Sequence, residues 1–105
     1  MRLYTSEEQT AKLIELGFEK PKMAAPALKW VDGEPTFEPQ YTIGELIEML
    51  PPRIKGINLS IDRYYEFEQW LVYWNACDRN QFFRGTELID VLYNAIIELK
   101  EDGVI

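Results

Sequence analysis

Two strands of a half-buried sheet are predicted by residues 57–74, which read INLSIDRYYEFEQWLVYW. In the first part of this stretch, Ile57, Leu59 and Ile61 alternate with polar residues, a two-residue period typical of a strand with one buried face. The second part, residues 67–74, is rich in the aromatic and β-branched residues that strands favour. The stretch therefore predicts an antiparallel hairpin.

Helices are predicted on both sides of this hairpin by their capping residues. The first begins at Thr5 or Ser6, each of which fits a capping box, and ends at Gly17. A short helix opens with the capping box at Thr42 and runs through Leu50, before two prolines. The longest helix is expected from residues 86 to 102, since a glycine follows at 103.

A second hairpin is predicted near the N-terminus, at residues 28–38. Asp32-Gly33 separates two short apolar runs, and this pair favours a tight hairpin turn because both turn positions require positive φ. Pro35 lacks the N–H that a ladder needs, so its strand is expected to be very short or to lie at an edge. Residues 76–84 are interpreted as a polar loop.

These elements predict a single small α+β domain that spans residues 1–105. The expected order is helix, hairpin, short helix, hairpin, long helix, with an antiparallel sheet and helices packed on it. A chain of 105 residues can bury one core, whereas two domains would each be near the lower size limit for unaided folding.

The composition excludes several kinds of chemistry. The chain has no histidine and one cysteine, Cys77, so the common zinc sites and the Ser-His and Cys-His catalytic pairs are not available. We predict no catalytic residue, no cofactor and no metal ligand. An unpaired cysteine and an N-terminus unlike a signal peptide favour a cytoplasmic protein, and no apolar run is long enough to cross a membrane.

The longest helix carries more apolar surface than one sheet needs. A polar stripe on its helical wheel leaves an apolar arc of about 240°, where a surface helix needs about 100°. Within that arc Ile89, Tyr93 and Ile97 form a second stripe. This stripe either packs against the first or second helix of the same chain or contacts another molecule.

Strand 67–74 is apolar on both faces as well. Trp70, Val72 and Trp74 are predicted to point one way, and Phe67, Leu71 and Tyr73 the other. One set therefore faces a second layer, solvent or a partner. The candidate interface that these two elements predict consists of Trp70, Tyr73, Trp74, Ile89, Tyr93 and Ile97.

Two other groups of residues are weaker candidates. Glu66 and Glu68 are expected on one strand face, where paired carboxylates would suit a metal or a glycosidase-like reaction, although a solvated face explains them too. The segment from Cys77 to Arg84 combines a thiol with two arginines. Without a histidine base it is better explained as a solvated turn whose Phe82 and Phe83 pack under the sheet, or as a docking loop, than as a nucleophile.

The net charge of −7 is a further constraint on partners. Direct DNA or RNA binding needs a basic face, so we expect none. An acidic chain could instead block a basic protein by imitating a nucleic acid, or its acidity could serve solubility alone.

Residues 41–105 resemble a group of small uncharacterised proteins encoded by bacterial prophages and mobile elements. The likeness lies in Tyr41 to Pro51, in a following hairpin with Trp or Tyr in its second strand, and in Glu87 to Tyr93. It implies a bacterial, cytoplasmic setting and an accessory role, and it carries over no functional residue.

The sequence thus favours a non-enzymatic protein-interaction module of phage or mobile-element type. Its partner would be another protein or a second copy of itself, as in a homodimer, with no direct nucleic acid and no membrane. Two alternatives stay open. One is an acidic inhibitor that imitates a nucleic acid, and the other is a carboxylate-based enzyme or small-ligand binder that uses residues such as Glu66 and Glu68.

Overall fold

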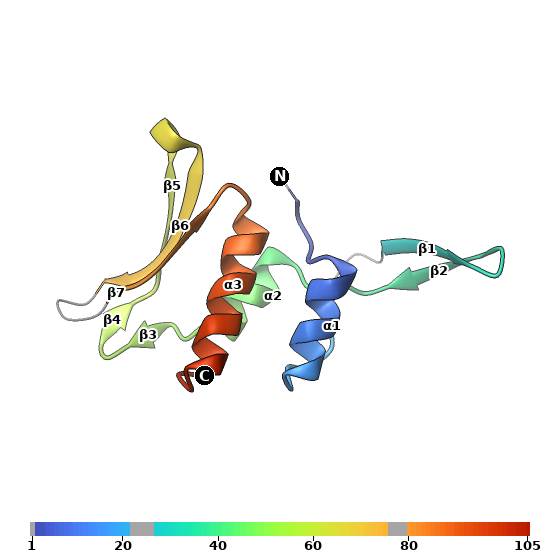
Figure 1. Cartoon of the computed structure of the whole chain (residues 1–105), viewed down its shortest axis with the longest axis horizontal. Coiled ribbons are helices and arrows are strands. Elements are labelled where there is room, and N and C mark those ends of the chain that lie inside the picture. The colour runs from blue at the N-terminus through green and yellow to red at the C-terminus, as the bar shows by residue number, and fades with distance from the viewer. Residues whose placement is uncertain (1, 22–26, 76–79) are drawn as a thin grey trace.

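The computed structural model describes residues 2–21, 27–75 and 80–105, and it shows an α+β fold (Figure 1). The expected order of helices and hairpins is confirmed, with additional short strands. The elements are, in chain order, α1 (Glu7–Glu15), β1 (Ala27–Val31), β2 (Glu34–Glu38), α2 (Ile43–Met49), β3 (Arg53–Ile54), β4 (Ile57–Asn58), β5 (Ser60–Tyr64), the 3₁₀ turn η1 (Tyr65–Phe67), β6 (Gln69–Asn75), β7 (Asn80–Gly85) and α3 (Leu88–Glu101).

Of the two capping boxes predicted for the first helix, the one at Ser6 forms, and the box predicted at Thr42 forms as well. The Ser6 side chain accepts from the Gln9 backbone N–H at 3.1 Å, and the Gln9 side chain accepts in return from the Ser6 N–H at 2.9 Å. Thr42 and Glu45 make the same reciprocal pair at the start of α2. Each box satisfies N–H groups that the first helical turn leaves without a partner, which is why the two short helices begin where they do.

The hairpin predicted at residues 28–38 forms around Asp32-Gly33, and both residues have the positive φ that the turn requires, 53° and 79°. Its two strands pair only with each other, so it is a two-stranded ribbon with two edges. Pro35 pairs with Trp30 in this ribbon, where both strands are edge strands, as its missing N–H requires. Figure 1 shows the ribbon projecting away from the helices.

The central sheet has the order β5-β6-β7 and is antiparallel throughout. Helix α3 packs against β6 and β7, and α2 packs against α3. Val72 and Trp74 of β6 are buried on the helix side of the sheet. Seven residues of α3 are buried too: Leu88, Ile89, Val91, Leu92, Ala95, Ile96 and Leu99. The core is therefore the space between α3, the sheet and the two shorter helices.

The close approach of the sheet to α3 explains one glycine. A Cβ atom at Gly85, the last residue of β7, would lie 2.9 Å from Cγ2 of Val91. Since Val91 is buried and branched, it has little room to move aside. Glycine at 85 thus allows β7 to turn directly into α3.

The predicted polar loop over residues 76–84 is wrong for residues 80–84, which belong to β7. Residues 76–79, which include Cys77, lie outside the described residues. In β7 the paired aromatics Phe82 and Phe83 put one apolar residue on each side of the sheet, so the strand lacks the alternation that would have revealed it. Its register on β6 places Phe82 opposite Tyr73 and Phe83 opposite Val72.

The hairpin predicted at residues 57–74 also differs from the structure in where its strands begin and end. Strand β6 begins at Gln69, two residues later than expected, because Tyr65–Phe67 form η1 and Glu68 adopts a left-handed conformation with φ 50°. The first strand divides at Leu59, whose N–H donates to the Pro52 carbonyl at 2.9 Å. The small ribbon β3–β4 precedes that division.

Helix α1 lies beside α3, and this explains the second apolar stripe of α3. Gln9 donates to Asp90 of α3 at 2.8 Å. Ile89 is fully buried, and the pKa of Tyr93 is raised by burial and, to a smaller extent, by the Glu8 carboxylate of α1. Of the two explanations for the stripe, packing within the same chain is the one that the structure supports.

We expect Trp74→Ala to lower the free energy of unfolding by about 3–5 kcal/mol, because the change empties a large buried volume and leaves the Pro51 carbonyl without the indole N–H that donates to it at 3.0 Å. Urea denaturation followed by circular dichroism measures this. Tyr65→Ala is the matched control, since that side chain is 82% exposed and its loss, together with that of its contact with Arg63, should change stability by no more than about 1 kcal/mol. Equal effects of the two changes would contradict the packing described here.

Candidate functional site

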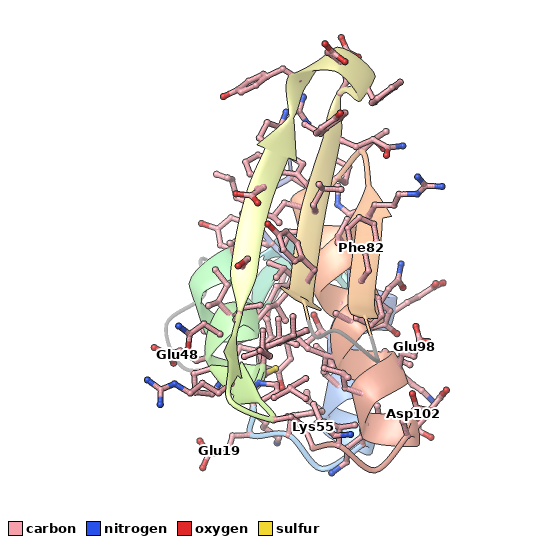
Figure 2. All side chains as sticks on the ribbon, turned by 90° about the vertical axis from the view of Figure 1, so that its left-hand side faces the viewer. Glu19, Glu48, Lys55, Phe82, Glu98 and Asp102 are labelled. Atoms are coloured by element: carbon pink, nitrogen blue, oxygen red, sulfur yellow. The ribbon has the colours of Figure 1, made fainter. Side chains whose placement is uncertain are left out.

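No helix or strand of the described residues packs on the face of the central sheet that is turned away from α3. Successive side chains of a strand point to opposite faces, and residues paired across strands share a face. Because Val72 and Trp74 point toward α3, the neighbouring positions point away from it. We call this the outer face, and its residues are Ser60, Asp62, Tyr64, Gln69, Leu71, Tyr73, Phe82 and Arg84. In Figure 2 the three strands lie in front of the helices, with Phe82 on the near side.

Apolar and aromatic side chains lie along the outer face and on the adjoining η1 turn. Tyr73 and Phe82 pack together with ring centroids 5.9 Å apart, and Leu71 follows along β6. At the far end Tyr64 stacks on Phe67 of η1, at 5.2 Å with the rings nearly parallel. We call these five residues the aromatic strip.

The aromatic strip is accessible over most of its length. Phe67 is 65% exposed, Phe82 47% and Tyr64 46%, and these are three of the six large apolar residues that are exposed in the described part of the chain. A folded chain gains free energy by removing such surface from water, so a cluster of this kind is typical of a contact surface.

The charges beside the strip are balanced, unlike those of the whole chain. Asp62 and Arg84 flank Leu71 across the three strands, one acidic and one basic. The Tyr73 hydroxyl donates to the Asp62 carboxylate at 2.5 Å. That hydrogen bond is the main cause that raises the pKa of Tyr73, with smaller contributions from desolvation and from the Asp62 charge, and it fixes the ring beside Phe82.

The opposite face carries a second aromatic group near η1, where an arginine lies between two rings. The Arg63 guanidinium lies 5.3 Å from the centre of the Trp70 ring and 6.0 Å from that of Tyr65. Cation–π contacts of this length stabilise an exposed site by about 0.5–1 kcal/mol. They hold the β5–β6 end of the sheet, where it extends past α3 in Figure 1.

Of the six predicted interface residues, the structure places one on the outer face, Tyr73. Trp70 is half-buried on the opposite face, and Tyr93 and Ile97 are half-buried against the core. Trp74 and Ile89 are at most 1% exposed, so they are core residues and not contact residues. This corrects the prediction for those two, because the Trp74 side of β6 and the Ile89 position of α3 are both buried in the core of the same chain.

Four residues of the aromatic strip are not among the six predicted interface residues: Tyr64, Phe67, Leu71 and Phe82. From the sequence, Phe82 is placed in a candidate docking loop and not in a strand beside Tyr73, and Tyr64 is placed between two predicted strands. The available signal was the pair Phe82-Phe83, since two adjacent aromatics in a strand must occupy opposite faces.

The structure contradicts the predicted carboxylate pair. Glu66 lies within η1 and Glu68 caps it in a left-handed conformation, so the two do not share a strand face. Among the residues that the structure describes, no group of three or more potential ligands gathers to hold a metal ion. From the segment that runs from Cys77 to Arg84, only residues 80–84 are described, and they form part of β7.

Two open hollows are lined by residues of α1, α2 and the segments next to them, and not by the central sheet. One has a volume of about 500 Å³, and its lining includes Phe18, Tyr41 and Met49 together with Glu45 and Glu48. The other, of about 440 Å³, lies against Thr10, Ala11 and Ile14 of α1. Glu45 already serves the α2 capping box, so the acidic side chains of the first hollow are partly committed to the fold.

No protein-family model, curated protein or solved structure matches this chain. In the ranges the structure describes, no helix has both the length and the apolar character that crossing a membrane requires.

We expect Asp62→Asn to lower the pKa of Tyr73 toward 10.0, the usual value for tyrosine, because the change removes a negative charge and a strong acceptor that favour the protonated phenol. In the unchanged protein the phenol should therefore keep its proton to a higher pH. NMR titration of ring-labelled tyrosine measures this. Tyr93, whose pKa is raised by burial and by Glu8, is the internal control and should not respond. A Tyr73 pKa that is the same in both proteins would contradict the hydrogen bond.

Proposed function

We propose that this protein is a non-enzymatic interaction module of accessory type, which binds a protein partner across the aromatic strip. The observation that carries the proposal is the one-sided cover of the central sheet. Helix α3 packs against β6 and β7 from one side, while the other side keeps Tyr64, Phe67 and Phe82 exposed. Contact surfaces are enriched in such aromatics.

The chemistry of the strip favours an apolar contact over a charged one. Its central row has one carboxylate and one guanidinium, so it offers no dense array of negative charge to a basic protein. An apolar contact should hold at high salt, because burial of apolar surface is not screened. The acidic-inhibitor alternative predicts the reverse, with binding that weakens steeply as salt rises.

The phage or mobile-element setting and the cytoplasmic location belong to this proposal as well. They rest on the resemblance of residues 41–105 and on the composition of the chain, and neither bears on which surface makes the contact. The partner is defined here by its chemistry, as a protein with an apolar surface that fits a sheet face.

We expect Phe82→Glu to weaken capture of the partner by at least about tenfold, since it places a charge in the middle of an apolar contact. The immobilised protein is exposed to lysate of its source cell and washed at rising salt, and the retained proteins are identified by mass spectrometry. Val104→Glu is the matched control, because Val104 is 41% exposed, close to the 47% of Phe82, and is not part of the strip.

The specific result is a protein that the unchanged chain and the Val104→Glu variant retain at high salt and that Phe82→Glu loses. Equal retention by both variants would contradict the proposed surface. Loss of the partner from all three at moderate salt would favour the acidic inhibitor instead. A chain that captures nothing and stays a monomer would contradict the proposal altogether.

A further inference from the structure

Two separate parts of the chain line the larger of the two open hollows, which we call the α2 hollow. One part is the segment from Phe18 to Lys20, which follows α1, and the other is α2 with the two residues before it. The Tyr41 hydroxyl donates to the Glu19 carbonyl, and this hydrogen bond ties the two parts together. The volume of about 500 Å³ lies within the range of small-molecule sites, about 300–1,000 Å³. The α2 hollow is therefore of a size that suits a small molecule.

Gly44 lines the α2 hollow, and nothing among the described residues requires a glycine at this position. Four of the six glycines have the positive φ that other residues rarely adopt: Gly17, Gly33, Gly56 and Gly103. Gly85 is required by the close approach of Val91. The backbone of Gly44 is helical, and an added Cβ atom would meet only the Thr42 hydroxyl oxygen, at the ordinary contact distance of 3.8 Å.

The glycine at position 44 therefore lowers the stability of α2 and keeps the hollow open. Within a helix glycine is less favourable than every residue except proline, since it loses the most backbone freedom on folding. A larger residue would instead fill part of the space that Gly44 lines. What this chain gains from the glycine is space in the hollow, as expected where a ligand occupies it.

The charges of the lining indicate which kind of ligand fits. Three glutamates line the α2 hollow, Glu19, Glu45 and Glu48, against one cation, Lys20. An anion would be repelled by this lining. A neutral molecule would remove water from the carboxylates without replacing its hydrogen bonds, which costs free energy. The lining therefore favours a cation.

Glu45 is held in place beside the hollow by the start of α2. Its carboxylate accepts from the Thr42 N–H at 3.1 Å and from the Thr42 hydroxyl at 3.2 Å. Burial is the main cause that raises the pKa of Tyr41, and the Glu45 charge raises it further. The negative charge of Glu45 thus acts on a residue of the lining, and it offsets the positive end of the helix dipole.

The apolar part of the lining distinguishes an organic cation from a metal ion. Phe18, Tyr41 and Met49 contribute to it, and the Phe18 ring already has the Lys100 ammonium 5.6 Å from its centre, a distance at which a ring attracts a cation. In the described ranges, no three or more potential ligands converge in a way that would hold a metal ion. Separated carboxylates beside aromatic and apolar surface suit an ammonium group on a carbon body.

We propose that the α2 hollow binds a small organic cation, an amine or guanidinium on an apolar body. The cationic group pairs with the carboxylates of Glu45 and Glu48, and the body lies against Phe18, Tyr41 and Met49. This inference is independent of the proposed function, because the hollow and the aromatic strip share no residue. The hollow is open, so we expect a dissociation constant on the order of 1 mM.

Three probes with the same phenyl body and different charges test the proposal. These are phenethylamine, which is a cation, phenethyl alcohol, which is neutral, and hydrocinnamate, which is an anion. Each is titrated into the isotope-labelled protein, and NMR follows the chemical shift of the Met49 methyl group. Phenethylamine should give a saturating shift, and the other two probes should bind at least about fivefold more weakly, since they make no ion pair with either carboxylate.

Variants at two positions locate the binding. Gly44→Leu fills part of the hollow and should weaken binding of phenethylamine at least about tenfold, whereas Gly44→Ala adds one methyl group and should keep most of it. Neither change should lower the thermal midpoint. Glu48→Gln should weaken binding about two- to fivefold, the effect of one exposed ion pair. Glu98→Gln is the matched control, because Glu98 is also exposed on a helix and does not line the hollow.

Four outcomes would overturn the inference. The first is no shift of the Met49 methyl group up to about 10 mM phenethylamine, and the second is equal affinity for the three probes. The third is equal binding by Gly44→Leu and the unchanged chain, which would place the ligand elsewhere. The fourth is a thermal midpoint that both changes at Gly44 lower, since the fold would then need that glycine. Because Glu48→Gln leaves Gly44 in place, equal weakening by Glu48→Gln and Glu98→Gln would also contradict the site if Gly44→Leu does not fold.

A basic side chain of a protein partner carries the same chemistry as the small cation, and the variants separate the two. The lysate capture described for Phe82→Glu is repeated with Gly44→Leu. A captured protein that Gly44→Leu loses, from a chain that does not bind phenethylamine, would assign the hollow to that partner and overturn the small-molecule assignment. Unchanged capture together with loss of phenethylamine binding is the result that we expect.

Discussion

Burial of α3 is the constraint on which the rest of the structure depends. Helices in small domains bury one stripe, whereas seven of the fourteen residues of α3 are buried. The sheet covers one side, α2 packs on another, and α1 reaches a third through Gln9 and Asp90. With about 25 cal/mol gained per Å² of apolar surface removed from water, this helix supplies the main driving force for bringing the elements together.

That arrangement also explains why the sheet is left open on its outer face. The chain has three helices in its described part, and all of them lie on the α3 side of the sheet or beyond it. The fourth element long enough to cover a sheet, the ribbon β1–β2, lies at the far end of the molecule. A chain that gathers its helices around α3 has none left for the second face of the sheet, and the exposed strip follows from this arrangement.

Short sequence motifs correctly predicted the parts of the fold that depend on only a few consecutive residues. The capping boxes at Ser6 and Thr42 and the turn at Asp32-Gly33 form as expected, because each is stabilised by its own few residues. Strand β7 was missed because it exists through its pairing with β6, which is not a local property. The candidate interface depended on which face of each element the core would bury, and that is decided by packing among distant segments. Tyr73 was placed correctly on the face opposite Trp74, and Ile89 was not recognised as core.

Successive side chains of β6 alternate between the core and the outer face, so neighbouring residues of this strand serve either the stability of the fold or the proposed contact. Val72 and Trp74 are buried against α3, while Leu71 and Tyr73 point to the outer face. A change at the first pair acts on the core, where a lost methylene costs about 0.8 kcal/mol or more. A change at the second pair acts on half-buried surface, so it costs the single chain less, and the rest of its cost appears when a partner covers that surface. The two kinds of change can therefore be distinguished by experiment. If both faces of β6 were buried in the core, changes at either pair would lower stability and the two effects could not be separated.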